Sequence, residues 1–246
     1  MKKYFLKAMG VGAGLILAGS VGVRGDVLYQ DTTTALGSAW LFPENQQIGE
    51  EIWLGTLLPE YLTNFSIEYY SPDSSWSGTV TADVRFYLNN GTPENGYPTP
   101  NTLFYDSGPV TFVNPLSATG GAENAMIATF ELADLQYPVA GGSALDPNFA
   151  LPTNFTFTIT FSGLTDGETV GLPIYEPPTV GTNYADYWYD ASGSWELMTN
   201  AAGGPVSFYA EFNGTNAPTP EPTVLGLGAL GAAVLTFMGR RRQRRG

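Results

Sequence analysis

The sequence predicts an all-β protein: an antiparallel two-sheet β-sandwich, jelly-roll-like, flanked by an N-terminal signal helix and a C-terminal transmembrane helix. Three observations support this class. Aromatic residues make up 13% of the chain, 30 glycines and 18 prolines supply turns, and apolar residues in the middle of the chain recur at every second position. A period of two is typical of strands with one face in a core and the other in water.

The alternation is clearest in 155–162, where bulky residues occupy odd positions and hydroxylated residues occupy even ones. We expect Phe157 to face the core and Thr158 to face water. Other segments alternate in the same way, and their inward-facing residues are Phe65, Ile67 and Tyr69; Val80, Ala82, Val84, Phe86 and Leu88; Met126, Ala128, Phe130 and Leu132; and Val206, Phe208, Ala210 and Phe212. Turn signals divide residues 26–212 into about eleven short strands, with no helix outside the two ends of the chain.

The charge distribution of the chain excludes several functions. Between residues 26 and 222 a single base, Arg85, stands against all 23 carboxylates, so this acidic segment carries a net charge of −22. Such a surface repels phosphates, which excludes nucleic-acid binding. The chain has no Cys and no His, which excludes disulfides, Cys/His zinc sites and catalysis by imidazole or thiolate. Arg85 is expected to form an ion pair that stabilises the fold.

Residues 1–25 are typical of a secretory signal peptide. Three lysines among the first seven residues precede a short apolar run, Ala8–Gly19, and small residues continue to Gly25. The apolar run is shorter than the ~17–25 residues that span a bilayer. We expect export by the Sec translocation machinery and cleavage after Gly25 or Gly22; the alternative is an uncleaved anchor helix.

The C-terminus has three consecutive parts. Residues 213–222 form a Pro-rich spacer, residues 223–239 are uncharged and just long enough for one transmembrane helix, and residues 240–246 are an Arg-rich tail. Basic residues stay cytoplasmic, so the bulk of the chain is expected outside. Glycines within the apolar part match the GxGxxG dinucleotide-binding pattern, but no strand–helix–strand unit surrounds them. We interpret them as small residues of a membrane helix.

This tail resembles the PEP-CTERM sorting signal, which the membrane enzyme exosortase recognises and processes. The matching residues are Pro220, Glu221 and Pro222, the apolar helix, and the arginines Arg240, Arg241, Arg242, Arg244 and Arg245. The resemblance implies an exported protein of a bacterium that makes exopolysaccharide, anchored transiently in the inner membrane and then placed at the cell surface or in the extracellular matrix. A plain tail anchor with a chance Pro-Glu-Pro is the alternative.

Four stretches of the middle domain carry a second resemblance: 47–55, 62–70, 84–89 and 103–109. They resemble a recurring ectodomain of PEP-CTERM proteins and the exported choice-of-anchor sandwiches. This resemblance implies a fold and no reaction.

Carboxylates are the candidates for catalysis and for metal binding. Glycoside hydrolysis needs only two of them, and Glu50 with Glu51, Glu68, or Asp186 with Asp190 can be proposed. None lies in a recognisable motif, so we expect no enzymatic activity. Calcium takes oxygen ligands, but the loose acidic clusters at 166–168 and 186–190 are more typical of hairpin turns. The sequence predicts no cofactor. It allows a bound calcium ion but does not identify the residues that would bind it.

The densest aromatic cluster spans 184–190 together with Trp195. The candidate glycan-binding residues are Tyr187, Trp188, Tyr189 and Trp195, with the first and third on one side of a strand and the second on the other. The alternative is an aromatic hairpin with cross-strand packing. The sequence thus predicts a non-catalytic exported surface or matrix protein associated with exopolysaccharide. The alternative function is a carbohydrate-binding module displayed at the cell surface, with neutral glycans favoured by the negative charge.

Overall fold

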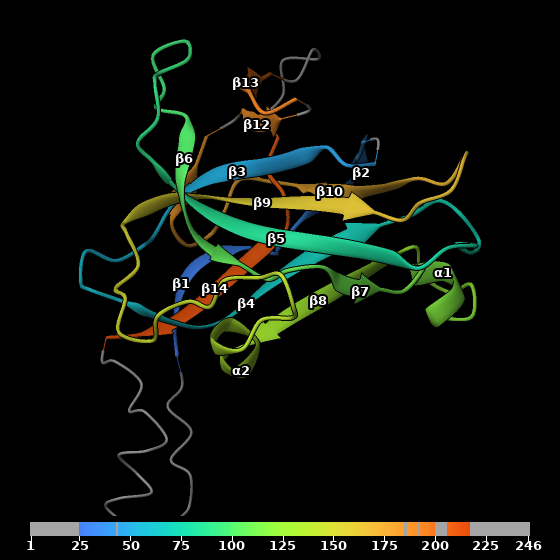
Figure 1. The fold of residues 1–246 in the computed structure, drawn as a ribbon, viewed down its shortest axis with the longest axis horizontal. Helices are drawn as coiled ribbons and strands as arrows, with labels where there is room; N and C mark the ends of the chain where they lie inside the picture. Colours follow the sequence, from blue (N-terminus) through green and yellow to red (C-terminus); the bar gives the residue numbers. More distant parts are fainter. Residues whose placement is uncertain (1–24, 43, 185, 191, 200–205, 217–246) are drawn as a thin grey trace, which may run out of the picture.

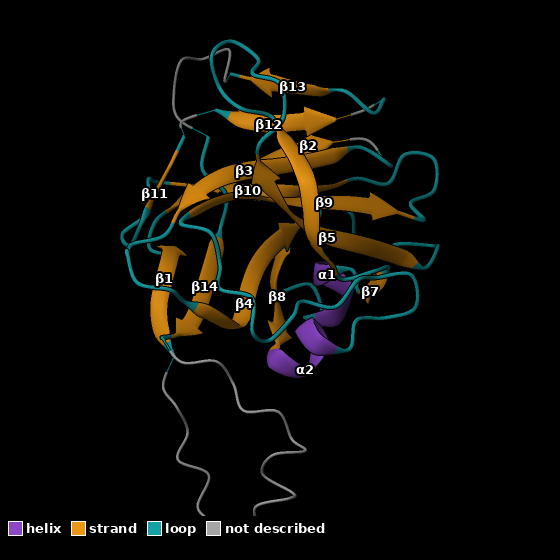
Figure 2. Cartoon of the chain, turned by 60° about the vertical axis from the view of Figure 1, so that its left-hand side comes forward, coloured by secondary structure: helices purple, strands orange, loops and turns teal. Residues whose placement is uncertain are grey.

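The computed structural model describes residues 25–42, 44–184, 186–190, 192–199 and 206–216. These residues form two antiparallel sheets packed face to face, with two short helices beside them (Figures 1 and 2). The prediction of an all-β, two-sheet class is therefore confirmed. Among the described residues no helix is long and apolar enough to cross a membrane.

Several predicted features lie outside the described residues. They are the signal peptide up to residue 24, the Pro-Glu-Pro motif at 220–222, the transmembrane segment 223–239 and the Arg-rich tail 240–246.

The described residues form fourteen strands and two helices, whereas the sequence predicts about eleven strands and no helix in this part of the chain. The strands are β1 (Asp26–Asp31), β2 (Ala35–Phe42), β3 (Gln47–Trp53), β4 (Tyr61–Tyr70), β5 (Val80–Asn89), β6 (Pro100–Asp106), β7 (Val110–Phe112), β8 (Ala125–Glu131), β9 (Asn154–Ser162), β10 (Val170–Tyr175), β11 (Thr182–Asn183), β12 (Tyr187–Asp190), β13 (Trp195–Met198) and β14 (Ala210–Thr215). The helices are α1 (Pro115–Ala118) and α2 (Leu132–Gln136).

The first sheet has the strand order β1-β14-β4-β10-β2, and β8 also pairs with β4. β14 lies between the first strand and β4, so that Phe212 is opposite both Tyr29 and Phe65. The first and last described strands are therefore neighbours, although they are far apart in the sequence.

The second sheet has the order β13-β12-β3-β9-β5-β6, with β11 also pairing with β3 and β7 with β5. β9 is central: Ile159 lies opposite Ile48 of β3 and Val84 of β5. The β12–β13 hairpin forms one edge of this sheet, at the opposite end of the domain from the points where the described chain begins and ends (Figures 1 and 2).

The core between the sheets is built from aromatic rings. Phe212 stacks on Phe65 within the first sheet, with ring centroids 5.6 Å apart. Phe86 and Phe155 reach them from the second sheet, at 4.9 Å from Phe65 and 5.4 Å from Phe212 respectively. Such tilted and edge-to-face pairs add specific attraction to the area that each ring buries.

Alternation predicts the inward faces of β4, of β5 as far as Phe86, and of β14 with the segment before it correctly, because the residues named for them are buried. Leu88 of β5 and Met126 and Ala128 of β8 are half-buried, whereas Phe130 of β8 is buried. For β9 the prediction that Thr158 faces water is wrong: Thr156 and Thr158 are fully buried, like Phe157. The reason is tertiary, since side chains from neighbouring strands cover the outer face of this central strand. Leu132 is not the last inward residue of a strand but the first residue of α2.

The expectation of no helix in the middle domain is also wrong. α1 begins after Asn114, whose side chain accepts a hydrogen bond from the Ser117 amide, and Pro115 occupies the first turn. α2 has a capping box in which Glu131 and Asp134 satisfy each other's backbone amides. Both are single turns, too short to show a helical period, although a capping residue followed by proline is a helix-start signal.

Candidate functional site

The β12–β13 hairpin that carries the aromatic cluster is fixed by its own turn. The carboxylate of Asp190 accepts hydrogen bonds from the backbone amides of Ser192, Gly193 and Ser194, at 2.9, 2.5 and 3.1 Å. Asp190 is therefore committed to the turn. The prediction that the acidic clusters lie on hairpin turns is confirmed for Asp190. It is wrong for 166–168, because this turn connects β9 of the second sheet to β10 of the first, and there Glu168 accepts from the amides of Thr165 and Ser77.

Two of the four predicted glycan-binding residues are buried. Tyr187 and Trp188 are each 1% exposed. The Tyr187 ring packs between the sheets, with centroids 5.0 Å from Trp40 and 5.9 Å from Phe208. Trp188 lies on the opposite face of the sheet, in register with Gly49. Neither ring can present a face to a sugar, and for both the alternative of cross-strand packing holds.

Tyr189 and Trp195 are half-buried and have different surroundings. Tyr189 packs against the hydrophobic core. Trp195 lies on the outer face of the second sheet, where its ring is 5.6 Å from that of Tyr87 and forms part of the wall of a surface hollow. Of the four predicted residues, Trp195 is the one that lines this surface hollow.

The hollow beside Trp195 lies between the β12–β13 hairpin and the β5–β6 connection, and it encloses about 550 Å³. It is polar, and its lining residues are Asn90, Gly91, Thr92, Glu94, Thr99, Pro100, Asn101, Gly193, Ser194 and Trp195. Amide and hydroxyl groups beside one indole are the combination that protein sites use to orient neutral polar ligands.

The walls of this polar hollow are held in place by hydrogen bonds. The side-chain oxygen of Asn90 accepts from the Asn101 amide at 3.3 Å and from the Thr102 backbone at 3.2 Å. Glu94 accepts from the backbone amide of Leu197, which ties the β5–β6 connection to β13. The hollow is thus formed by two segments that are about a hundred residues apart in the sequence, as the separation of 103 between Leu197 and Glu94 shows.

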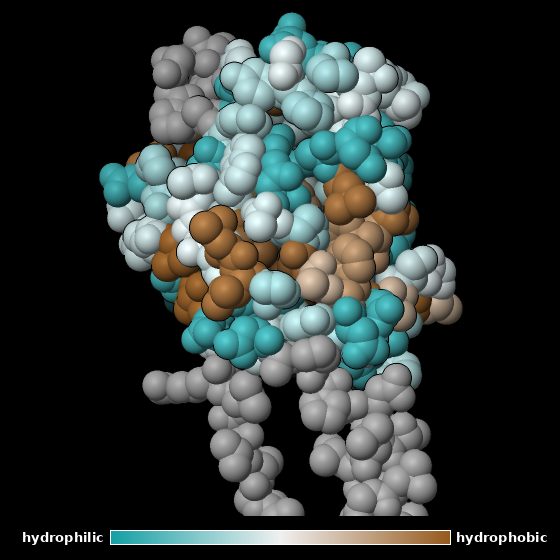
Figure 3. Space-filling view, turned by 90° about the vertical axis from the view of Figure 1, so that its left-hand side faces the viewer, coloured by the Kyte–Doolittle hydropathy of each residue, from teal (hydrophilic) through white to brown (hydrophobic). Residues whose placement is uncertain are grey.

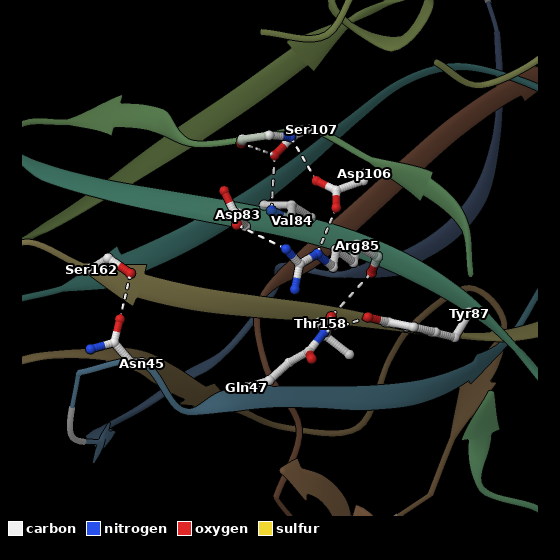
Figure 4. A network of polar contacts seen from close by, with 11 residues as sticks. Asn45, Gln47, Asp83, Val84, Arg85, Tyr87, Asp106, Ser107, Thr158 and Ser162 are labelled. Carbon is white, nitrogen blue, oxygen red and sulfur yellow. Dashed lines mark hydrogen bonds and ion pairs between the residues drawn. The ribbon is translucent and has the colours of Figure 1, made fainter. Parts of the chain in front are cut away.

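Beneath the hairpin, the outer face of the second sheet carries a layer of polar side chains (Figure 4). Gln47 donates to Thr158 at 2.6 Å and to Tyr87 at 3.0 Å, which explains why Thr158 is buried. Arg85 forms ion pairs with Asp106 at 2.7 Å and with Asp83 at 3.0 Å. The prediction of a stabilising ion pair at Arg85 is confirmed.

Glu51 lies in the same outer layer, and it is 2% exposed. Burial raises its pKa to about 7, while the nearby donors of Trp188, Asn89 and Asn154 act in the opposite direction. The Asn154 amide donates to one carboxylate oxygen at 2.5 Å, and the other oxygen has no hydrogen-bond partner. Glu51 is therefore a buried acid that holds a proton more readily than an ordinary glutamate.

The structure separates Glu50 from Glu51 and engages Glu68 and Asp190 in other contacts. Glu50 and Glu51 are consecutive in β3 and point to opposite faces of the sheet, one between the sheets and one outward. Glu68 accepts a hydrogen bond from the Tyr175 hydroxyl at 2.6 Å. Among the described lining residues of the polar hollow, Glu94 is the single carboxylate.

The burial of Glu50 was missed from the sequence, although the signal was present, because the alternation of β3 places it between Ile48 and Ile52 on the inward face. In the described part of the chain no cluster of three or more His, Cys, Asp or Glu residues is arranged to hold a metal ion. No protein-family model, curated protein or solved structure matches this chain.

Proposed function

We propose that this chain is a non-catalytic exported protein, delivered through the membrane by its N-terminal segment and sorted by an exosortase through its C-terminal tail. Its final place is the cell surface or the exopolysaccharide matrix. The support comes from the two terminal sequence patterns, the acidic segment with a net charge of −22, and the position of the two chain ends on the folded domain.

The observation that carries the proposal is that the domain begins and ends at one point. Asp26 is opposite Gly214 and Val27 is opposite Asn213 in the β1–β14 pair. The described chain thus starts and stops on adjacent strands, whereas the β12–β13 hairpin lies at the other end of the domain (Figures 1 and 2). This hairpin lines the polar hollow. A tether at the C-terminus would hold the domain at one end and turn the hollow away from the membrane.

The end that carries the two termini also exposes apolar side chains. Leu57 and Leu58 are 93% and 62% exposed in the β3–β4 connection. This connection is fixed beside the chain ends, because the Gly55 amide donates to the Leu28 carbonyl and Tyr61 pairs with Thr215. Figure 3 shows apolar side chains gathered on the lower half of this side of the domain. Exposed leucines at this position suit an end that faces a membrane.

Among its described lining residues, the polar hollow does not carry a pair of carboxylates. Hydrolysis of a glycosidic bond needs a pair of carboxylates on either side of the bond. Glu94 is the one carboxylate among the described lining residues, and its oxygen accepts a backbone hydrogen bond from Leu197.

The sorting proposal is tested by replacing Pro220, Glu221 and Pro222 with alanine in a host that carries an exosortase. We expect the variant to stay in the membrane fraction as a precursor, while the wild-type chain leaves it. Pro218→Ala is the matched control, because it alters the spacer outside the motif and should leave sorting unchanged. Normal release of the triple variant would overturn the role of the motif.

A second function, carbohydrate binding by the polar hollow, is favoured by one observation. Trp195 stands beside the exposed amides of Asn90 and Asn101, in a hollow whose walls are already fixed by hydrogen bonds. An indole face and fixed amides together suit a neutral sugar. This proposal replaces the predicted platform of four aromatic residues by one of them together with amides of the β5–β6 connection.

The glycan proposal is tested with the full-length chain in detergent micelles on an array of neutral glycans. Trp195→Ala should abolish retention and leave the melting temperature nearly unchanged. Tyr187→Ala is the contrasting variant, because its ring is buried and its removal should lower the melting temperature. Retention that survives Trp195→Ala, or no retention by the wild-type chain, would refute glycan binding at this hollow and leave the sorting proposal untouched.

A further inference from the structure

Two acidic side chains lie buried between the sheets without a basic partner. Asp31, the last residue of β1, is 1% exposed, and Glu50 of β3 is 0% exposed. The only basic side chain in the described part of the chain is Arg85, which is on the outer face of the second sheet and is paired with Asp83 and Asp106. A buried carboxylate is strongly unfavourable unless a positive charge or a proton neutralises it.

Neutral polar groups surround the two acids. The Ser207 hydroxyl donates to Asp31, and the Asn183 amide donates to Glu50 and, at 2.6 Å, to Ser207. The backbone amide of Phe208 donates to the second oxygen of Glu50 at 3.2 Å. A rotation of the Asn183 side-chain amide by 180° exchanges the positions of its oxygen and nitrogen. In that orientation Asn183 presents an oxygen to the cluster. Both acids, a hydroxyl and an amide thus meet at one point.

Two further oxygens at this point have no hydrogen-bond partner. They are Oδ1 of Asp31 and the hydroxyl of Tyr29, and both side chains are at least 99% buried. Tyr29 and Asp31 are two residues apart in β1, so their side chains point to the same buried side of the strand. Burial together with the charges of Glu50 and Asp31 raises the pKa of Tyr29. Buried polar atoms are normally hydrogen-bonded, so two oxygens without a partner in one cluster need an explanation.

We propose that this cluster binds one calcium ion through oxygens of Asp31, Glu50, Asn183, Ser207 and Tyr29. Two carboxylates match the double positive charge, and every donor is an oxygen, the ligand type that calcium takes in sets of about 6–8. The chain offers no Cys or His to favour zinc. The inference does not depend on the proposed function.

The calcium ion would connect the two sheets. Asp31 and Tyr29 belong to β1 of the first sheet, Glu50 and Asn183 belong to β3 and β11 of the second, and Ser207 lies in the segment that leads into β14. Because the site is assembled only in the folded chain, calcium stabilises the folded state by mass action.

The competing arrangement is a pair of protonated acids. Burial raises the pKa of Asp31 to about 6 and the pKa of Glu50 well above its ordinary value, so protons can neutralise the cluster when no cation is bound. The two arrangements differ in the effect of calcium and in the effect of Glu50→Gln. Glutamine has the shape of a protonated glutamate but cannot ionise.

The test uses the full-length chain in detergent micelles, stripped with EDTA and then titrated with calcium chloride. Equilibrium dialysis should give one ion per chain. Thermal unfolding should show a melting temperature that rises by about 5–10 °C at a free calcium concentration about 100 times the dissociation constant. Glu50→Gln and Asp31→Asn should abolish both effects.

Glu51→Gln is the matched control, because Glu51 is the next residue of the same strand, is equally buried and faces away from the cluster. It should retain the full calcium response. Ser207→Ala provides a milder variant, expected to weaken calcium binding by roughly tenfold through loss of one oxygen ligand. No calcium binding by the wild-type chain would overturn the proposal. A full calcium response in Glu50→Gln or in Asp31→Asn would also overturn it.

Discussion

Replacing Phe212 by alanine should show how far the last strand joins the two sheets. Phe212 is fully buried in β14, and its ring centroid lies 5.4–5.7 Å from those of Phe65, Phe86, Phe155 and Phe157. Truncation of a buried phenylalanine costs ~3–5 kcal/mol. That is a large share of the ~5–15 kcal/mol by which a domain is typically stable. The melting temperature should therefore fall by about 6–20 °C.

The assay is thermal unfolding of the full-length chain in detergent micelles, followed by near-ultraviolet circular dichroism. Tyr137→Ala is the matched control, because it removes an aromatic ring that is 74% exposed and should change the free energy of unfolding by less than ~0.5 kcal/mol. Equal melting temperatures for Phe212→Ala and Tyr137→Ala would refute the placement of β14 in the core.

Three further predictions follow from burial and pairing. Thr158→Asp should destabilise the domain strongly, because Thr158 is fully buried. Thr129→Asp, on the exposed face of β8, is the control and should be tolerated. Equal Tm values for the two variants would show that the outer face of β9 is open to solvent. The pKa of Glu51 is raised to about 7, so the folded state holds a proton that the unfolded state has lost, and stability should fall as pH rises from about 4.5 to 7. Glu51→Gln should flatten that fall in a pH series of Tm values, and an unchanged slope would contradict it. A fragment of residues 25–216 should fold alone, and a fragment that ends at residue 212 should be less stable in urea, because Asn213, Gly214 and Thr215 pair with β4.

The sequence was most informative where one face of a strand meets the core and the other meets water. Alternation located the inward faces of β4, β5 and β14, and the single base of the acidic segment was correctly expected in an ion pair. These features depend on neighbours within a strand or on the number of residues of one charge. Both are visible in the sequence itself.

The sequence was least informative where distant segments cover a strand. Thr158 has the composition of a surface position, but Gln47 and Tyr87 form a polar layer above it. Trp188 lies in a hairpin at the edge of the second sheet, yet its side chain is buried. Alternation shows that the two faces of a strand differ, but it does not show which remote segment closes the second face.

The domain boundary shows the same limit. The sequence predicts that the spacer begins at residue 213, because the segment from there to Pro222 is rich in proline. β14 nevertheless continues to Thr215, because β4 offers backbone partners as far as Tyr61. The end of a strand is decided by its partner strand and not by its own residues alone.

The most direct test of the central claim, that the chain is exported and sorted through its tail, is the intact mass of the wild-type protein recovered from the cell surface or medium of a host that carries an exosortase. We expect a mass that lacks the signal peptide and the arginines Arg240 to Arg245. A surface protein whose mass still includes those arginines would contradict sorting by removal of the tail.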